Sequence, residues 1–282
     1  MKSGGRSEFA CTIPGLELRP PGIWYSRTNS PISYPESAHA DFLKAEDRSF
    51  WFRHRGRCIV DLVRKFSSGG LFLDVGGGNG IVAKYLVEAG KQCVVIEPGV
   101  DGALAAHRRG IATVICARVE DISLPADSIS DCGIFDVIEH IENDVEVLAR
   151  IRTWLKPGGR LFLSVPAYQW LFSAEDVYAG HIRRYSAQSL RRSLGAAGFE
   201  IVFMSYLFAP LVAPLLLLRN LPFRLGFRHK AKPNIQADHM PGAAIEAGLD
   251  RLLDWELRIL KRGRSIPFGT SCLCVAQRRS DG

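Results

Sequence analysis

Short apolar runs alternate with helical patterns along the middle of this chain, and this alternation limits the possible folds more than any other feature. The apolar runs stand at residues 71–75, 92–98, 113–117, 132–138 and 160–166. Segments with helical spacing separate several of them: residues 80–90, 100–110 and 143–159. This pattern is typical of βαβ units, in which helices cover both faces of a parallel sheet. Because such crossovers are right-handed, we expect an α/β fold with a doubly wound sheet.

The start of the chain and one late stretch depart from this alternation. Residues 1–36 are rich in Gly, Pro and Ser, and we expect them to form a flexible arm. Residues 37–66 show helical spacing and predict a helical cap before the sheet. The sheet domain then comprises residues 37–208 together with 271–279. Between these parts, residues 209–270 form an insertion that is too long for an ordinary loop.

The composition indicates a folded, reduced chain. With 282 residues, 47% of them hydrophobic and 23% charged, the chain can bury a core without covalent cross-links. Its 7 cysteines are scattered and include no C-x-x-C pair, which argues against a disulfide framework and favours a cytoplasmic location. No apolar stretch near the start predicts a secretory signal. The net charge of +7 is too mild a bias to indicate a nucleic-acid partner.

The most specific motif is a glycine loop directly after the first apolar run. Residues 74–80 read D-V-G-G-G-N-G and lead into a helical pattern. Glycines allow positive φ angles and let a ligand approach the backbone closely. A dinucleotide fingerprint would need a glycine where Ile81 stands, and no Gly-Lys-Ser/Thr follows as in a Walker loop. The spacing therefore argues against a pyrophosphate or triphosphate ligand.

The D-x-G-x-G-x-G arrangement resembles motif I of the class I S-adenosylmethionine-dependent methyltransferases. Members of this class fold into a Rossmann-like, doubly wound sheet of seven mostly parallel strands. In this resemblance Asp74 faces the ammonium group of the cofactor, and the loop of Gly76, Gly78 and Gly80 lies against its adenosyl group. S-adenosylmethionine carries a positive charge and no phosphate, so an acidic residue beside flat backbone suits it.

Residues after the next strands complete the cofactor site that the resemblance implies. Glu97 ends the second strand, where a carboxylate can accept hydrogen bonds from ribose hydroxyls. Glu120 or Asp121, after the third strand, would meet the adenine amino group, and Phe135 ends the fourth strand. The sequence F-D-V-I-E-H at 135–140 resembles the small-molecule branch that includes the ubiquinone-biosynthesis enzymes. This resemblance specifies the cofactor and the fold more than the acceptor.

Candidates for a catalytic base lie after the fourth and fifth strands. Methyl transfer mainly requires alignment of the acceptor with the methyl group, and removal of a proton from a hydroxyl or amine acceptor. Glu139 and His140 lie at the carboxyl edge of the sheet by their position. Residues 176–186 read D-V-Y-A-G-H-I-R-R-Y-S, which resembles bacterial methyltransferases found with glycosyltransferases and lipid-building enzymes. This segment contributes His181 and Tyr185 as further catalytic candidates.

Structural alternatives stay open for several of these residues. His181 and Arg183 could serve only to hold their loop against the sheet. Asp136, with the adjacent Glu139 and His140, offers too few ligands for a metal, so we expect no metal site. The helix before the sheet either covers the cofactor cleft or merely packs on the domain, and the residues in question are Trp51, Phe52, Arg53 and Arg55.

The insertion begins with an apolar segment beside a basic cluster. Residues 201–218 are uncharged, but their first part fits a sixth strand, and 209–218 is too short and too rich in proline to span a membrane. The basic residues that follow are Arg219, Arg224, Arg228, Lys230 and Lys232. We favour peripheral contact of 209–232 with an anionic surface on the inner face of the membrane. A buried hairpin over the active site and a dimer contact remain alternatives. A leucine-rich face over 243–261 predicts a helix that packs back on the domain.

The sequence therefore favours methyl transfer from S-adenosylmethionine to a small or lipid-linked acceptor, at a hydroxyl oxygen. A catalytically silent, membrane-associated scaffold that keeps the cofactor pocket is one alternative. A nicotinamide-dependent oxidoreductase is another, and the glycine spacing argues against it. A nucleic-acid methyltransferase is disfavoured, because the fourth strand lacks the N-P-P-Y type of motif and no RNA-binding module is apparent.

Overall fold

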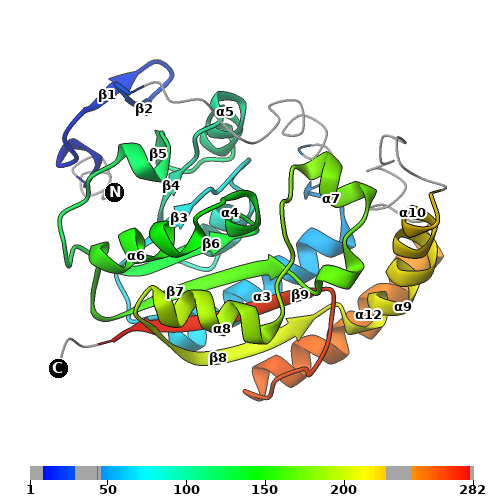
Figure 1. Cartoon of the computed structure of the whole chain (residues 1–282). Helices are drawn as coiled ribbons and strands as arrows, with labels where there is room; N and C mark the ends of the chain where they lie inside the picture. Colours follow the sequence, from blue (N-terminus) through cyan, green and yellow to red (C-terminus); the bar gives the residue numbers. More distant parts are fainter. Residues whose placement is uncertain (1–8, 29–42, 44–45, 227–242, 280–282) are drawn as a thin grey trace.

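The computed structural model describes residues 9–28, 43, 46–226 and 243–279. Within these residues, nine strands form one sheet in the order β1-β2-β5-β4-β3-β6-β7-β9-β8. Neighbouring strands from β2 to β7 are parallel, whereas β9 runs antiparallel to both β7 and β8. Figure 1 shows helices on both faces of this sheet, which confirms the predicted doubly wound α/β architecture.

Strands and helices alternate along the chain as the apolar runs predicted. The strands of this series are β3 (Leu71–Val75), β4 (Gln92–Ile96), β5 (Thr113–Cys116), β6 (Ile129–Phe135), β7 (Leu155–Pro166), β8 (Phe199–Leu207) and β9 (Ser271–Arg278). The helices among them are α4 (Ile81–Glu88), α5 (Val100–Arg108), α6 (Asp144–Trp154), α7 (Ala174–Ala179) and α8 (Ala187–Ala196). Ser186 caps α8, as the sequence suggested.

Both faces of the sheet are buried, which explains why its strands are continuously apolar. Along β3, Phe72 points into one hydrophobic cluster while Leu73 and Val75 point into the other. Successive side chains of a strand face opposite sides, so each central strand needs apolar residues at every position.

Two expectations are wrong. Residues 16–19 and 23–26 are strands rather than parts of a flexible arm, and the sheet has nine strands in the described residues rather than seven. Strands β1 (Leu16–Arg19) and β2 (Ile23–Ser26) form a hairpin that extends the sheet beside β5. Ile23 is fully buried, and the backbone of Tyr25 pairs with that of Cys116. The hairpin covers an edge of β5 that would otherwise present unpaired backbone groups. The short apolar run of β2 was hidden by the surrounding Pro and Gly residues.

The helical cap before the sheet is interrupted by a turn: Leu43 and Glu46 are helical, and a new helix begins at Phe50. Helix α3 (Phe50–Phe66) starts after Ser49, whose side chain accepts a hydrogen bond from the Trp51 amide. Most of residues 37–45 lie outside the described part of the chain.

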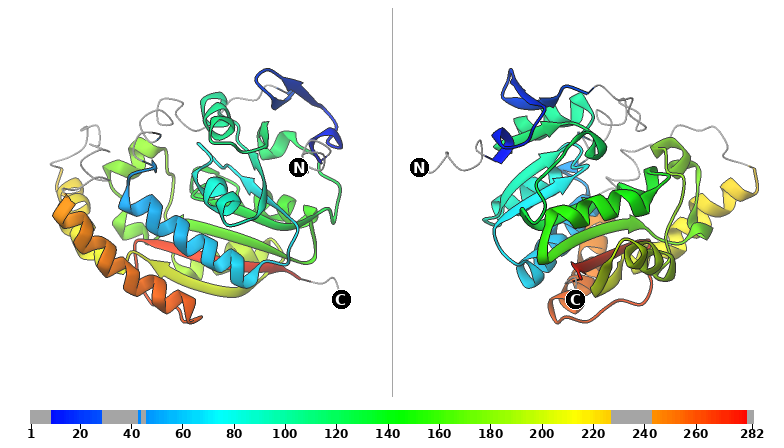
Figure 2. Two further views of the ribbon diagram at one scale, coloured as in Figure 1. Left: turned by 180° about the vertical axis from the view of Figure 1, so that it is seen from behind. Right: turned by 60° about the vertical axis from the view of Figure 1, so that its left-hand side comes forward.

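Helix α12 (Ala243–Lys261) packs along α3, as its leucine face predicted (Figure 2). Three of its leucines are buried: Leu253, Leu257 and Leu260. His54 Nε2 lies 3.0 Å from a carboxylate oxygen of Glu256, and both side chains are buried. The same carboxylate accepts hydrogen bonds from the amides of Phe208 and Ala209 at the end of β8. These contacts fix the far part of the insertion against the cap helix.

The first part of the insertion folds into short helical turns at one end of the molecule. They are a 3₁₀ turn (Ala209–Leu211), α9 (Val212–Leu215), a π-helical turn (Leu216–Asn220) and α10 (Leu221–Arg224). No helix in the described residues is both long and apolar enough to cross a membrane. The basic residues Arg228, Lys230 and Lys232 lie outside the described part of the chain.

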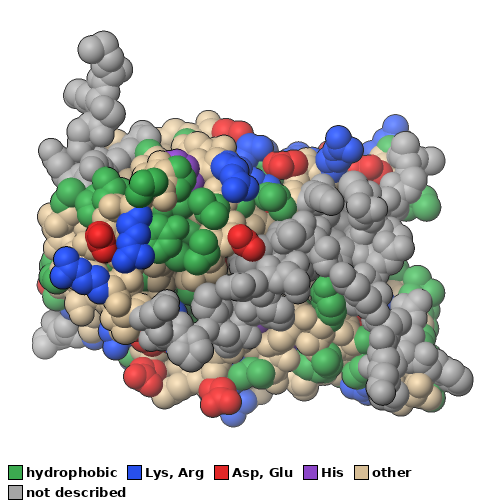
Figure 3. All heavy atoms as spheres, turned by 90° about the horizontal axis from the view of Figure 1, so that it is seen from above, with side chains coloured by type: hydrophobic (Ala, Val, Ile, Leu, Met, Phe, Trp, Pro, Cys, Tyr) green, Lys and Arg blue, Asp and Glu red, His purple; other side chains and the backbone are tan. Residues whose placement is uncertain are grey.

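The charged side chains of the described residues are mixed in sign. Figure 3 shows Lys and Arg interspersed with Asp and Glu on the face seen from above. The net charge of +7 therefore does not collect into one basic patch on that face.

Candidate active site

A cavity of about 970 Å³ opens at the carboxyl ends of the parallel strands. Its walls come from the glycine loop, the ends of β4 and β6, the cap helix α3 and the first turns of the insertion. Ligands of open α/β sheets bind at this edge. The volume is at the upper end of the roughly 300–1,000 Å³ typical of small-molecule sites, so a cofactor and an acceptor can share it.

The glycine loop adopts the positive φ angles that its sequence predicted. Gly76 and Gly78 line the cavity, and their φ angles are +67° and +53°. A Cβ atom added at Gly78 would meet no atom within 4 Å, so the loop leaves open space in front of its backbone. Gly80 does not line the cavity. A Cβ atom there would lie 2.8 Å from that of Ala106, so Gly80 allows α4 to pack against α5.

Two buried acids flank the glycine loop. Asp74 and Glu97 are only 1% and 5% exposed. Glu97 accepts hydrogen bonds from the amides of Gly78 (2.8 Å) and Gly99 (2.7 Å), while Asp74 Oδ2 has no hydrogen-bond partner among the described residues. Burial raises the pKa of each acid to about 7, and the nearby Arg55 moderates this rise for Asp74. A buried carboxylate with an unused acceptor oxygen fits the cationic cofactor that the resemblance implies.

The residues expected to meet adenine divide into two groups. Glu120 and Phe135 line the cavity, and Glu120 lies 3.2 Å from the guanidinium of Arg118. Asp121, at the end of the same 3₁₀ turn, does not line it. The structure therefore favours Glu120 over Asp121.

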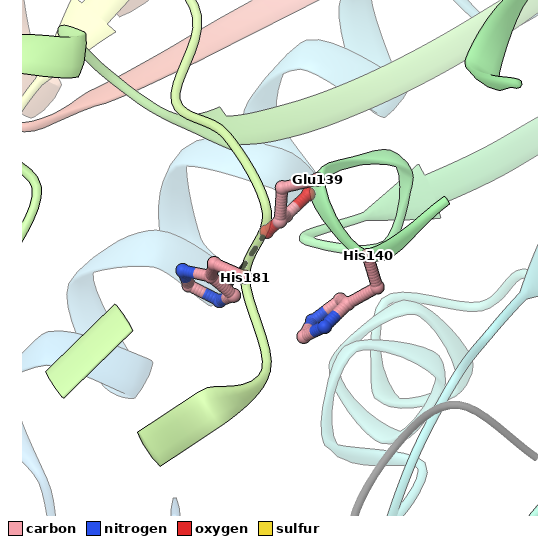
Figure 4. Close-up of side chains that lie close together, drawn as sticks. All are labelled: Glu139, His140 and His181. Carbon is pink, nitrogen blue, oxygen red and sulfur yellow. Dashed lines mark ion pairs between the residues drawn. The ribbon is translucent and has the colours of Figure 1, made fainter. Parts of the chain in front are cut away.

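The catalytic candidates meet after the end of β6, in the lining of the same cavity. Glu139 and His140 lie in the 3₁₀ turn Ile138–His140 after β6, and His181 lies in the loop after α7 (Figure 4). His181 Nε2 is 3.9 Å from Glu139 Oε1, and the two imidazole rings are 4.8 Å apart. The other nitrogen of His181, Nδ1, lies 2.7 Å from Asp176 Oδ1. The fold thus brings together residues that are far apart in the sequence.

Burial controls the protonation of this group. It raises the pKa of Glu139 well above its usual value, and the negative charge of Asp136 adds to the rise. Burial also lowers the pKa of His140 to about 4, with a further decrease from the adjacent His181. His140 is therefore neutral at pH 7. Although burial opposes ionisation of Asp176, hydrogen bonds from His181 and Arg184 bring its pKa below the usual value.

Tyr185 and Arg183 lie outside the cavity lining. Tyr185 is 2% exposed and donates a hydrogen bond to the Asp144 carboxylate at 2.8 Å. Arg183 donates to the carbonyl oxygen of Glu142. Both side chains hold the loop against α6, and this position gives Tyr185 no contact with the cavity.

Two arginines contribute more to the site than sequence reasoning assigned to them. Arg55 is buried in the cavity wall, 2.7 Å from Asp136 Oδ2 and stacked over the Trp51 ring. Arg184 also lines the cavity and holds both oxygens of Asp176, at 2.8 and 2.9 Å. Arg55 stands two residues from Arg53 and Arg57, and Arg184 stands next to Arg183. The sequence therefore gave no signal for which of these arginines faces inward. Trp51 and Phe52 line the cavity as well, so α3 covers the cleft.

Comparison with known proteins agrees with this geometry. A methyltransferase-domain family matches residues 51–203, more than half of the chain. The chain belongs to the S-adenosylmethionine-dependent methyltransferases. The nicotinamide-dependent alternative is therefore wrong, in agreement with the glycine spacing that argued against it.

Three similar proteins show how far the likeness extends. A Mycolicibacterium smegmatis protein named as an S-adenosylmethionine-dependent methyltransferase is 24% identical over 61% of this chain and 67% of its own length. A ubiquinone biosynthesis O-methyltransferase of Colwellia psychrerythraea is 28% identical over 33% of this chain, and the match spans only 40% of that relative. A solved Haloferax volcanii methyltransferase, in complex with the Trm112 activator, shares the fold with a TM-score of 0.56 and 16% identity, over 88% of this chain and 96% of that one.

Replacing Gly78 with alanine tests the open face of the glycine loop. A methyl group at Gly78 projects into the cavity, so Gly78→Ala is expected to weaken S-adenosylhomocysteine binding at least ~10-fold, which corresponds to about 1.4 kcal/mol. Gly90→Ala is the matched control, because Gly90 also has a positive φ and open surroundings but does not line the cavity. Calorimetric titration measures both. Equal affinities in the two variants would contradict this role of the loop.

The two buried acids predict a pH dependence of cofactor binding. Their pKa values near 7 leave them partly protonated in the ligand-free protein, whereas a cationic ligand favours the ionised forms. The affinity for S-adenosylmethionine should therefore fall about 10- to 70-fold from pH ~7.5 to pH ~6, with proton release on binding. Glu97→Gln removes one titrating group and should flatten the profile. An affinity that rises as the pH falls would contradict this assignment.

Proposed function

We propose that this chain transfers the methyl group of S-adenosylmethionine to a hydroxyl oxygen of a small or lipid-linked acceptor. The observation that carries the proposal is the division of one cavity between two kinds of wall. The glycine loop, Asp74 and Glu97 form one part of the lining, the cofactor wall, and Glu139, His140 and His181 form another, here termed the acceptor wall. A transfer reaction needs both ligands in one water-poor site.

The acceptor wall suits an acceptor that must lose a proton. A neutral hydroxyl is a poor nucleophile, so its proton has to leave as the oxygen attacks the methyl carbon. Glu139, His140 and His181 gather nitrogen and oxygen atoms where that proton would be removed. The sulfonium of the cofactor is already a good leaving group, so positioning and deprotonation are what remain for the protein to supply.

The first turns of the insertion support an acceptor with an apolar part. Leu211, Leu215 and Leu218 line the mouth of the cavity. The same segment exposes large leucines, with exposed fractions of 59% for Leu217, 67% for Leu218, 45% for Leu221 and 61% for Leu225. An acceptor held in a lipid surface could therefore reach the cavity along this segment, here termed the apolar rim (residues 211–225).

Transfer of a radiolabelled methyl group into fractionated cell extract tests the proposed acceptor class. The proposal predicts label in the lipid or glycan pool. Glu139→Gln should reduce the label by at least ~10-fold, because it removes a carboxylate from the place where the acceptor loses its proton. Label confined to the RNA or protein pool would contradict the acceptor class. Cofactor binding without any transfer would instead support the catalytically silent scaffold.

Vesicle binding tests the apolar rim. Exposed leucines beside Arg219 and Arg224 should bind vesicles that contain an anionic phospholipid better than neutral ones, and less well at high salt. Replacing both Leu217 and Leu218 with serine should weaken this binding about 10-fold or more. Each substitution removes the free energy gained when a leucine side chain moves from water into the lipid. Leu18→Ser, at an exposed leucine on the distant β1, is the matched control. Unchanged sedimentation of the double variant with vesicles would contradict the membrane contact.

A further inference from the structure

Three potential metal ligands from two segments meet in the acceptor wall. A carboxylate oxygen of Glu139 and one nitrogen each of His140 and His181 all lie within 4.8 Å of one another. In Figure 4 the side chains extend from the turn after β6 and from the loop after α7 toward a shared space. From the sequence we expected too few ligands, because we considered only Asp136, Glu139 and His140, which are close in the sequence. The fold supplies His181, from the loop that follows α7.

The carboxylate of Glu139 lacks the contacts that a buried acid normally has. Its exposed fraction is 0%, and neither of its oxygens has a hydrogen-bond partner in the described part of the chain. The positive charge of Arg55 offsets its burial only in part, and His181 Nε2 lies 3.9 Å from its Oε1. Leaving a buried carboxylate in this state is costly, whereas a bound cation would satisfy it. Glu139 also lines the cavity, so such a cation could enter from it.

Both histidines are held by an acceptor on their Nδ1 side. His181 Nδ1 lies 2.7 Å from Asp176, and Arg184 holds that carboxylate from the other side. His140 Nδ1 lies 3.2 Å from the carbonyl oxygen of Gly180. An acceptor at Nδ1 fixes the tautomer whose Nε2 carries a lone pair. Carboxylate–histidine and carbonyl–histidine pairs of this kind orient metal-binding histidines in known sites.

Asp136, a nearby acid that could serve as a fourth ligand, is already engaged elsewhere. Its Oδ2 pairs with Arg55 at 2.7 Å, and its Oδ1 accepts a hydrogen bond from Ser164 at 3.0 Å. The candidate ligand set is therefore two imidazoles and one carboxylate, in the lining of the cavity. Catalytic metal sites keep such an open position for water or substrate.

We propose that Glu139, His140 and His181 bind one divalent first-row transition metal, and that the acceptor hydroxyl occupies its open position. Two nitrogen ligands favour Zn²⁺ or Co²⁺ over Mg²⁺ or Mn²⁺, which prefer oxygen. Ligands ~2.1 Å from a tetrahedral ion lie ~3.4 Å apart, so atoms that now lie within 4.8 Å of one another need to approach by at most about 1.4 Å. The metal site stands on its own geometry, and only the role of the acceptor rests on the proposed function.

The proposed site gives a balanced route to methyl transfer. The cation lowers the pKa of the acceptor hydroxyl, whose proton passes to solvent. The acceptor oxygen then forms a bond to the methyl carbon, and the carbon–sulfur bond breaks with its electron pair going to sulfur. S-adenosylmethionine thereby becomes neutral S-adenosylhomocysteine, the acceptor becomes a methyl ether, and the metal keeps its oxidation state.

Titration of the metal-free protein with Co²⁺ tests the site directly. Protein without a histidine tag is stripped with a chelator, and visible absorption reports the Co²⁺ coordination while calorimetry measures Zn²⁺ affinity. One ion per chain is expected. Glu139→Gln and His181→Asn should each weaken binding at least ~100-fold, and Asp176→Asn about 10- to 100-fold with an altered Co²⁺ spectrum. His107→Gln is the control, because His107 lies on α5 and does not line the cavity.

Cofactor binding separates loss of the metal site from loss of the fold. S-adenosylhomocysteine affinity should be retained in Glu139→Gln and His181→Asn, since the glycine loop is intact. Absence of a Co²⁺ spectrum in the parent protein, or unchanged metal affinity in both variants, would overturn the metal site. Full methyl transfer by chelator-treated protein would overturn the role of the metal while leaving the proposed function in place. Metal binding without transfer would instead count against the proposed function.

Discussion

The hydrogen bonds between Glu97 and the backbone around it are the interaction on which the cofactor side of the cavity depends. The carboxylate at the end of β4 accepts from the amides of Gly78 and Gly99 and so fixes the glycine loop after β3 to the next strand. The amide of Gly76 also donates to the carbonyl oxygen of Ile96. Without these bonds, a loop of consecutive glycines would be free to adopt many conformations. The loop is preorganised for a ligand because the neighbouring strand holds it.

A second connection joins the cap helix to the acceptor side. Arg55 on α3 pairs with Asp136 at the end of β6 and also approaches Ser164 on β7. Arg55 is buried, Asp136 is half-buried, and both line the cavity. The cap helix is in turn held by Glu256 of α12, through His54. The insertion therefore holds the cap helix in place through α12 and also forms the apolar rim of the cavity.

Much of the fold and of the cofactor wall could be predicted because they depend on local sequence. The apolar runs of β3 to β7 follow from burial on both faces, and the glycine loop follows from backbone geometry at 74–80. The hairpin of β1 and β2 could not be predicted in the same way, because its stability comes from pairing with β5, far along the chain. Short strands of this kind are decided by tertiary context.

The acceptor wall was harder to predict for the same reason. The sequence indicated Glu139, His140 and His181 individually. That they meet follows only from the structure of the loop after α7, which brings His181 to the other two. Tyr185 stands in the same motif as His181 yet faces Asp144, and Arg184 faces the cavity while its neighbour Arg183 does not. Side-chain direction in an irregular loop has no periodicity from which it could be derived. Motif membership therefore identified the segment and left the inward residues to be found in the structure.

A structure of the complex with S-adenosylhomocysteine tests the central claim most directly. The account places the ribose hydroxyls at Glu97, the amino group near Asp74 and the sulfur on the side of Glu139 and His181. The ligand backbone should pass across Gly78 without displacing it. Density for the nucleoside elsewhere in the cavity, or a glycine loop that rearranges to close this space, would contradict the account.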